Sequence, residues 1–171
     1  MSAPPREIER TWLLSRLPAL PPHAQRHELE QGYLPDPAPG DAAAGRGELE
    51  GRLRRAVGPD GRLKCTHTVK RGSGLVREEV EREISEAELL REWPRTAGRR
   101  LSKVRWKVRE GEHVWEVDEF PHLGLVLCEV ELADEHESPA PPAWLAPWLV
   151  RDVTEDPRYR NYALATRGRP E

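Results

Sequence analysis

Short segments in which apolar and polar residues alternate recur along most of the chain, and this period of two predicts β-strands. The pattern predicts seven or eight strands, over residues 7–14, 25–34, 49–56, 62–70, 75–84, 99–109, 114–120 and 125–132. Gly-rich turns at 58–61 and 71–74 separate neighbouring strands, as expected for hairpins.

Two segments depart from this alternation and predict short helices. In the first, over 85–93, Ser85 is the expected N-cap, Glu88 completes a capping box, and Pro94 ends the helix. The second is a terminal helix within 153–165. Strands that outnumber helices in this way predict an α+β, mostly β domain.

The chain of 171 residues predicts a single domain spanning 1–171. Residues 35–47 are rich in Pro and Gly and are expected to form a flexible loop, and the Pro-rich segment 134–147 is expected to run over the surface. Trp144 and Trp148, four residues apart, predict either packing of this segment onto the domain or a subunit contact, which leaves a homodimer open.

Composition narrows the class of protein. With 27 basic and 30 acidic residues and a net charge of −3, a general nucleic-acid binder and a membrane-surface binder are both disfavoured. We find no run of 18 apolar residues and no apolar secretory segment at the N-terminus. Cys65 and Cys128 are too few for a disulfide scaffold and are expected to be small buried residues. A cytoplasmic globular protein is therefore expected.

Charged residues gather on one face of most strands, because residues i and i+2 share a face. The acidic positions are Glu7, Glu9, Glu116, Asp118, Glu129 and Glu131, the basic positions are Arg52, Arg54, Lys64, Lys70, Lys103, Arg105 and Lys107, and one mixed strand carries Arg77, Glu79, Glu81 and Glu83. All four lysines of the chain lie on these faces, against 23 arginines in total.

Two arrangements explain this pattern. An antiparallel sheet with one solvated face shows the same alternation. Alternatively, the strands close into a barrel with the charges inside, and such an interior must hold water, metal ions and a charged ligand, because unpaired buried charge is very costly. The single sign along most strands favours the barrel, since an ordinary soluble face mixes both signs.

The residue types inside such a barrel point to phosphoryl chemistry. Carboxylates are the ligands that hard divalent cations prefer. Arginine forks match phosphate oxygens, and lysine acts as a point charge. Carboxylates, a metal and a phosphate chain neutralise one another, which is what phosphoryl transfer requires.

Short motifs follow one another over residues 7–165, namely EIERT at 7–11, QGYL at 31–34, RLR at 52–54, Lys70 before a glycine turn, REEVE at 77–81, WP at 93–94, GRR at 98–100, KVR at 103–105, EVD at 116–118, EVE at 129–131, VTED at 153–156 and YRN at 159–161. Their order and spacing resemble those of the CYTH domains, also called triphosphate tunnel metalloenzymes, with EIERT in place of the family's ExExK.

This resemblance implies a closed eight-stranded antiparallel barrel that holds a triphosphate, with short helices packed outside and at the C-terminus. Mg²⁺ or Mn²⁺ is then expected at Glu7, Glu9, Glu129 and Glu131, with Asp118 and Glu79 at a second metal position. The triphosphate is expected to contact Arg52, Arg54, Lys70, Arg77, Lys103 and Arg105, with Lys70 and Arg77 as the catalytic residues and Arg158 or Arg160 closing one end.

The chain departs from the family pattern at Thr11, where the resembling enzymes have the lysine of ExExK. Thr11 brings no positive charge, and Arg10 points to the other face of a regular strand. Losing one such contact costs about 2–4 kcal/mol of transition-state stabilisation. The expected function is a divalent-metal-dependent phosphohydrolase acting on inorganic triphosphate; the alternatives are an adenylate cyclase or a triphosphate-binding module with weak turnover. Thiamine triphosphate and nucleotides are other substrates of the family.

Overall fold

A computed structural model describes residues 5–35, 49–72 and 74–171 of the chain. The loop predicted over 35–47 therefore lies outside the described residues, apart from Pro35, and so does Ser73 of the predicted turn.

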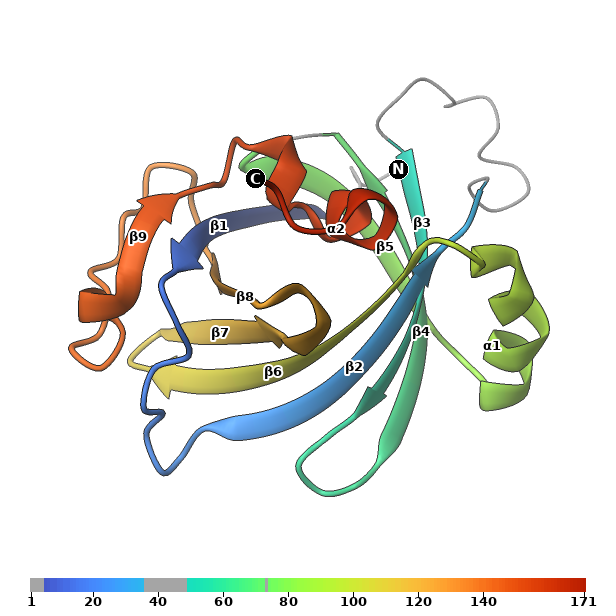
Figure 1. Ribbon diagram of the computed structural model, residues 1–171, viewed down its shortest axis with the longest axis horizontal. Coiled ribbons are helices and arrows are strands. Elements are labelled where there is room, and N and C mark those ends of the chain that lie inside the picture. Colours follow the sequence, from blue (N-terminus) through green and yellow to red (C-terminus); the bar gives the residue numbers. More distant parts are fainter. Residues whose placement is uncertain (1–4, 36–48, 73) are drawn as a thin grey trace.

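The described residues form nine strands, all paired antiparallel. They are β1 (Arg6–Leu14), β2 (Gln25–Tyr33), β3 (Leu49–Val57), β4 (Leu63–Arg71), β5 (Val76–Ile84), β6 (Arg100–Glu110), β7 (His113–Phe120), β8 (Leu125–Glu131) and β9 (Leu149–Asp152). Their order in the sheet is β5-β4-β3-β2-β6-β7-β8-β1-β9, and a further pairing of β1 with β5 closes the first eight into a barrel (Figure 1). The predicted closed eight-stranded antiparallel barrel is therefore confirmed.

β1 closes the barrel by dividing its length between two partners. Its first residues pair with β5, where Glu7 lies opposite Arg77, and the rest pairs with β8, where Thr11 lies opposite Glu129. β9 pairs with the last part of β1, at Trp12–Leu14. This ninth strand was not predicted, because four residues are too few to show alternation.

Two α-helices and four 3₁₀ turns complete the described structure. They are α1 (Glu86–Glu92), α2 (Asn161–Arg167), η2 (Trp93–Thr96), η3 (Pro121–Leu123), η4 (Ala146–Trp148) and η5 (Pro157–Tyr159). Ser85 caps α1 as predicted, with its Oγ accepting a hydrogen bond of 3.0 Å from the Glu88 N–H. The α+β, mostly β class is thus confirmed, and among the described helices none has the length and apolar character needed to cross a membrane.

The apolar faces of the strands point outward and are covered by other parts of the chain. On the β1–β7–β8 side, Trp115, Val117 and Val130 are buried in a cluster that includes Leu145 from the Pro-rich segment. Trp144 packs on the same cluster and donates a hydrogen bond of 3.0 Å to Glu110. Trp144 therefore packs the Pro-rich segment onto the barrel, which is one of the two roles predicted for it.

The inside of the barrel is divided between an apolar part and a charged part. The apolar part holds Phe120, Leu125 and Leu127, against which Leu164 of α2 packs. In Figure 1, α2 lies within the curve of the sheet. Because one part of the interior is filled with apolar side chains, the charged residues of the same strands are confined to the remaining space.

Gly32 of the QGYL segment has a packing reason to be glycine. A Cβ at this position would lie 2.5 Å from Cβ and Oγ1 of Thr96, which is fully buried in η2. The Thr96 hydroxyl accepts a hydrogen bond of 2.9 Å from Arg100 Nε. The glycine therefore lets η2 approach β2 closely, although the two are far apart in the sequence.

Candidate active site

The charged faces of the strands converge on a cavity of about 550 Å³ inside the barrel. A smaller pocket adjoins it toward α2 and shares several lining residues, among them Glu9 and Lys70. We call the two together the barrel cavity. Its walls contain most of the predicted site residues, namely Glu7, Glu9, Arg52, Arg54, Lys70, Arg77, Glu79, Arg105, Glu129, Glu131 and Arg160.

Lys70 lies between two carboxylates on one wall of the cavity. Its Nζ is 2.7 Å from Glu7 Oε2 and 3.2 Å from Glu79 Oε2. Burial alone would lower the pKa of this lysine, but Glu9 and Glu7 outweigh it and the pKa is raised. Lys70 therefore stays a cation and cannot act as a general base.

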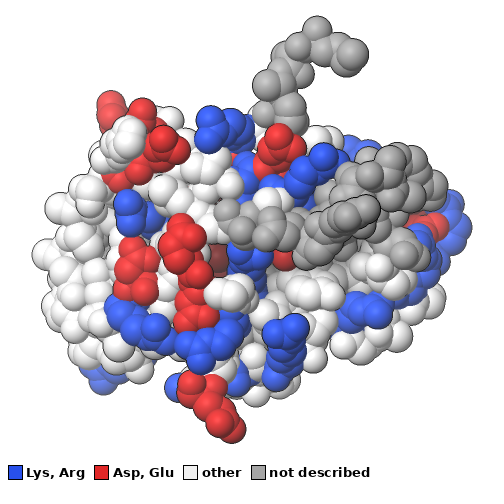
Figure 2. Space-filling view, turned by 90° about the horizontal axis from the view of Figure 1, so that it is seen from above, with Lys and Arg blue, Asp and Glu red and all other residues white. Residues whose placement is uncertain are grey.

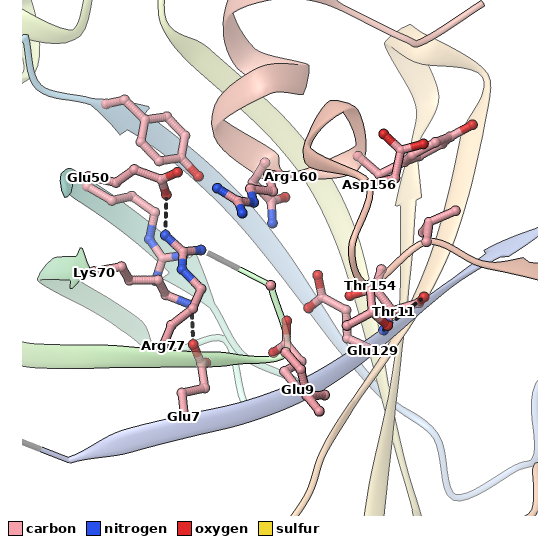
Figure 3. Close-up of a pocket in the computed structure, with 17 residues that line it drawn as sticks. Glu7, Glu9, Thr11, Glu50, Lys70, Arg77, Glu129, Thr154, Asp156 and Arg160 are labelled. Carbon is pink, nitrogen blue, oxygen red and sulfur yellow. Dashed lines mark hydrogen bonds and ion pairs between the residues drawn. The ribbon is translucent and has the colours of Figure 1, made fainter. Parts of the chain in front are cut away.

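Arg77 and Arg52 offer buried donors with no hydrogen-bond partner in the described structure. The Nε atoms of both guanidinium groups are in this state. Arg77 is otherwise paired with Glu50, at 3.1 Å from Nη2 to Oε2, as Figure 3 shows. Buried donors left unpaired are costly, so these atoms are suited to an anion that enters the cavity.

Lys103 and Asp118 lie behind the cavity wall rather than in it. Both side chains are completely buried, and Lys103 Nζ is 2.5 Å from Asp118 Oδ2. Neither residue lines the barrel cavity. Both were predicted as ligand residues, but the structure does not bring them to the surface where a ligand would bind.

Asp118 also binds Arg105, which does reach the cavity. Arg105 donates to both carboxylate oxygens of Asp118, at 2.6 and 2.7 Å. Burial favours the neutral carboxyl, but Arg105 and Lys103 hold its pKa well below the usual range. Arg105 further pairs with Glu116 and, at 2.6 Å, with Glu129. It thus connects the buried cluster of Lys103 and Asp118 to the acidic wall, by which we mean Glu7, Glu9, Glu116, Glu129 and Glu131.

The acidic wall carries an excess of carboxylates that repel one another. Burial and the neighbouring Glu129 and Glu7 raise the pKa of Glu9 well above its usual value. Burial, Glu7 and Glu116 likewise raise the pKa of Glu131. A divalent cation relieves such repulsion, and oxygen donors are its preferred ligands.

The carboxylates nevertheless do not form a complete cation site by themselves. Among the described residues, no three His, Cys, Asp or Glu side chains come close enough together to hold a metal ion. Mg²⁺ commonly takes only one or two carboxylates and completes its shell with water and substrate phosphates. The donor set therefore fits a metal that arrives with a phosphate ligand.

Thr11 lies on the wall of the smaller pocket, opposite Glu129 in the register of β1 and β8. Its backbone N–H donates to Thr154 Oγ1 at 3.0 Å. Arg10 points away from the cavity, as expected for a regular strand, and pairs with Asp152. Neither residue therefore supplies a positive charge at this position.

The guanidinium group of Arg160 brings a positive charge from the other side of the pocket. In Figure 3 it points into the cavity from the segment before α2. In the described part of the chain it has no ion pair or side-chain hydrogen bond. Arg158, the other candidate for closing the barrel, is instead exposed and pairs with Asp156 at 2.8 Å.

Several residues that line the cavity were missing from the predicted set. Glu50 shares a face of β3 with Arg52 and Arg54, so the same period of two contained the signal. Asn161 has no such signal, because only the fold brings the start of α2 to the cavity. Besides Thr11, the other polar lining residues outside the predicted set are Glu81, Lys107, Glu112, Glu116, Tyr33, Thr154, Asp156 and Tyr159.

Acidic and basic residues are also interleaved on the outer surface. Figure 2 shows both signs close together on the face seen from above. Exposed pairs such as Arg71–Glu78 contribute little to stability. The charges that distinguish this protein are therefore those inside the barrel.

Comparison with known proteins agrees with this architecture. No family model matches the chain. An inorganic triphosphatase of Nitrosomonas europaea is 38% identical over 165 residues, which cover 93% of this chain and 96% of the relative. An inorganic triphosphatase of Acetivibrio thermocellus is 42% identical over 66 residues, covering 37% of this chain and 40% of the relative.

Solved structures share the fold. A crystal structure of an inorganic triphosphatase superposes with a TM-score of 0.60 at 29% identity and covers 99% of both chains. A conserved protein of Pyrococcus furiosus, at 18% identity, has a TM-score of 0.50 and covers 76% of this chain and 80% of its own; this match concerns the fold alone.

The fold and the site together define a closed β-barrel with a charged internal tunnel. The full-length relative adds a sequence match along the same strands. The chain belongs to the CYTH family of triphosphate tunnel metalloenzymes.

Proposed function

We propose that the chain is an inorganic triphosphatase that requires Mg²⁺ or Mn²⁺ and hydrolyses a phosphoric anhydride bond inside the barrel cavity. The observation that carries this proposal is the convergence of acidic and basic side chains on one enclosed cavity. An ordinary solvated face would not enclose them. The similarity to relatives called inorganic triphosphatases supports the choice of substrate.

The basic residues of the cavity would bind the phosphate chain. Arg52 and Arg77 have buried Nε donors free for phosphate oxygens, and Arg160 has no competing carboxylate in the described structure. The complete proposed set is Arg52, Arg54, Lys70, Arg77, Arg105 and Arg160. Lys103 would act through Asp118 and Arg105 rather than by touching the substrate.

The acidic residues would hold the metal. Glu7, Glu9, Glu129 and Glu131 are the proposed ligands, with Glu79 at a second position; Asp118 is left out because both of its oxygens are engaged by Lys103 and Arg105. When bound, the divalent cation neutralises charge on the phosphate oxygens.

The chain's own residues contribute orientation and charge to the reaction. Water attacks the terminal phosphorus in line, the anhydride P–O bond breaks, and pyrophosphate leaves. Lys70 and Arg77 are the proposed catalytic residues, because fixed cations stabilise the charge that spreads over the phosphoryl oxygens. Their ion pairs with Glu7 and Glu50 hold them in place before the substrate binds.

Two alternatives from the sequence differ in their products. An adenylate cyclase would release cyclic AMP and pyrophosphate from ATP, and a binding module would release nothing. The charged lining of the cavity gives no support to a purine pocket. The absence of a lysine at position 11, where the chain has Thr11, motivates the binding module.

A substrate screen tests the proposal. Phosphate release is measured from tripolyphosphate, ATP and thiamine triphosphate, each with Mg²⁺, with Mn²⁺ and with excess EDTA. We expect the highest kcat/KM on tripolyphosphate and no release in EDTA. Cyclic AMP formation, or tight tripolyphosphate binding without any release, would contradict the proposal. The cytoplasmic location and the homodimer stay predictions.

A further inference from the structure

Arg54 differs from its neighbours in the cavity because a neutral side chain holds it. Gln31 Oε1 accepts from Arg54 Nε at 3.2 Å and from Nη2 at 3.1 Å. The two residues are paired across β2 and β3. In the described part of the chain, Arg54 has no carboxylate within ion-pair distance.

Arg105, by contrast, is held by a carboxylate. Its Nε and Nη2 also donate to one neighbouring side chain, but here to the two carboxylate oxygens of Asp118, and Arg105 also pairs with Glu129. Its charge is therefore largely neutralised within the protein. Arg54 keeps its charge, and burial together with nearby Arg52 and Arg105 lowers its pKa to about 10. It remains protonated at neutral pH.

Gln31 is itself fixed by its surroundings. The side chain is completely buried, and Nε2 donates to the Tyr33 hydroxyl at 3.0 Å. That hydrogen bond sets the direction of the amide, because the oxygen must then face Arg54. Tyr33 is also buried and packs edge-on against Tyr162 of α2. The positions of both Tyr33 and Gln31 are therefore fixed by packing.

We propose that Gln31 is a positioning residue for anion binding: it orients the Arg54 guanidinium toward the cavity while leaving its positive charge available to the phosphate chain. This deepens the proposed function and rests on it. Gln31 does not touch the cavity, so its effect passes entirely through Arg54. An acidic residue here would hold Arg54 equally well but would cancel its charge.

The test is Gln31→Glu, which keeps the size and the acceptor and adds one negative charge. Tripolyphosphate binding is measured by calorimetry in EDTA, so that no turnover interferes, together with thermal unfolding. We expect the Kd to rise about tenfold or more, because a charge-assisted hydrogen bond is lost, while the melting temperature stays the same or rises. A merely structural role predicts the reverse, namely a lower melting temperature with little change in Kd.

Two further variants complete the experiment. Leu90→Glu adds the same charge to the outer face of α1, where Leu90 is exposed and lines neither pocket of the barrel cavity; it should leave the Kd within about twofold. Gln31→Met keeps the charge of Arg54 but removes its acceptor, and should weaken binding less than Gln31→Glu.

The outcomes separate the inference from the function on which it rests. If the unchanged chain binds tripolyphosphate and Gln31→Glu binds it equally well, the role of Gln31 is overturned and the proposed function stands. If the unchanged chain does not bind tripolyphosphate in EDTA, the same variants are compared by their KM for tripolyphosphate with Mg²⁺, and both the inference and the function are overturned if no phosphate is released there either. Should Gln31→Glu not fold, Arg54→Met replaces it: weaker binding supports an available charge at Arg54, and unchanged binding rejects it.

Discussion

Arg105 and Asp118 form a two-pronged ion pair in the wall of the barrel, with Nε and Nη2 of the arginine 2.6 and 2.7 Å from the two carboxylate oxygens. Lys103 is bound to the same carboxylate. One buried acidic group thus compensates two cations. The pair gives Arg105 its direction: Nη2 also donates to Glu129 on the acidic wall, and Nη1, which Asp118 does not contact, pairs with Glu116.

Asp118→Asn should therefore be strongly destabilising. The substitution leaves Lys103 without a counter-ion at a site with no solvent access. Removing one partner of a buried pair typically costs about 3–5 kcal/mol. Urea unfolding measures this loss. Glu78→Gln is the matched control, because it breaks an exposed pair with Arg71 and should cost less than about 1 kcal/mol. An equal loss in free energy of unfolding in the two variants would show that the buried Lys103–Asp118–Arg105 cluster does not stabilise the barrel.

Thr11→Lys should raise kcat on tripolyphosphate if the missing charge limits the rate. The new ammonium group would face the cavity beside Glu129, which is the cross-strand partner of Thr11. A single electrostatic contact is worth about 10²–10³ in kcat. Steady-state kinetics test this, and Thr11→Met supplies the added length without the charge. An unchanged or lower kcat in Thr11→Lys would reject the account.

Glu129→Gln should abolish metal dependence and most of the activity. Glu129 is buried and lies where the acidic wall meets Arg105, so the amide would lose both the metal and the ion pair. We expect kcat to fall about 100-fold or more, and added Mn²⁺ not to restore it. Glu119→Gln, on β7, is the control, since Glu119 does not line the cavity. Full activity in Glu129→Gln would remove this residue from the metal site.

Glu9→Gln should stabilise the metal-free protein at neutral pH. The pKa of Glu9 is raised by burial and by Glu129 and Glu7, so above about pH 4.5 ionising Glu9 costs more free energy in the folded state than in the unfolded chain. Stability attributable to Glu9 is then highest at low pH and falls as the pH rises from about 4.5 through the folded pKa. Replacing Glu9 with a neutral residue removes this loss.

Thermal unfolding with and without Mg²⁺ tests this prediction. Without metal, the variant should melt higher, by about 2–4 °C for each kcal/mol of repulsion removed. With metal, the wild-type chain should gain more than the variant, because it binds the ion with one more carboxylate. A variant that melts lower than the wild type in EDTA would contradict the repulsion inferred for Glu9.

The period of two in the sequence determines most of the barrel. It predicted seven or eight strands, because a half-buried strand must alternate its side chains. It also identified the charged face of most of them, including Glu7, Lys70 and Glu129. Local rules did the same for α1, where Ser85 caps the helix as predicted. β9 was not predicted, because its four residues form a strand only by pairing with the free edge of β1.

The depth and partners of each charge were decided by the tertiary structure alone. Lys70 and Lys103 both lie on the charged faces of their strands, yet Lys70 lines the cavity and Lys103 is completely buried behind it. Pairing of β1 with β5, far apart in the chain, turns an open charged face into an enclosed cavity. Alternation along a strand specifies a direction relative to the sheet, whereas burial and charge compensation depend on which other strands close around that direction.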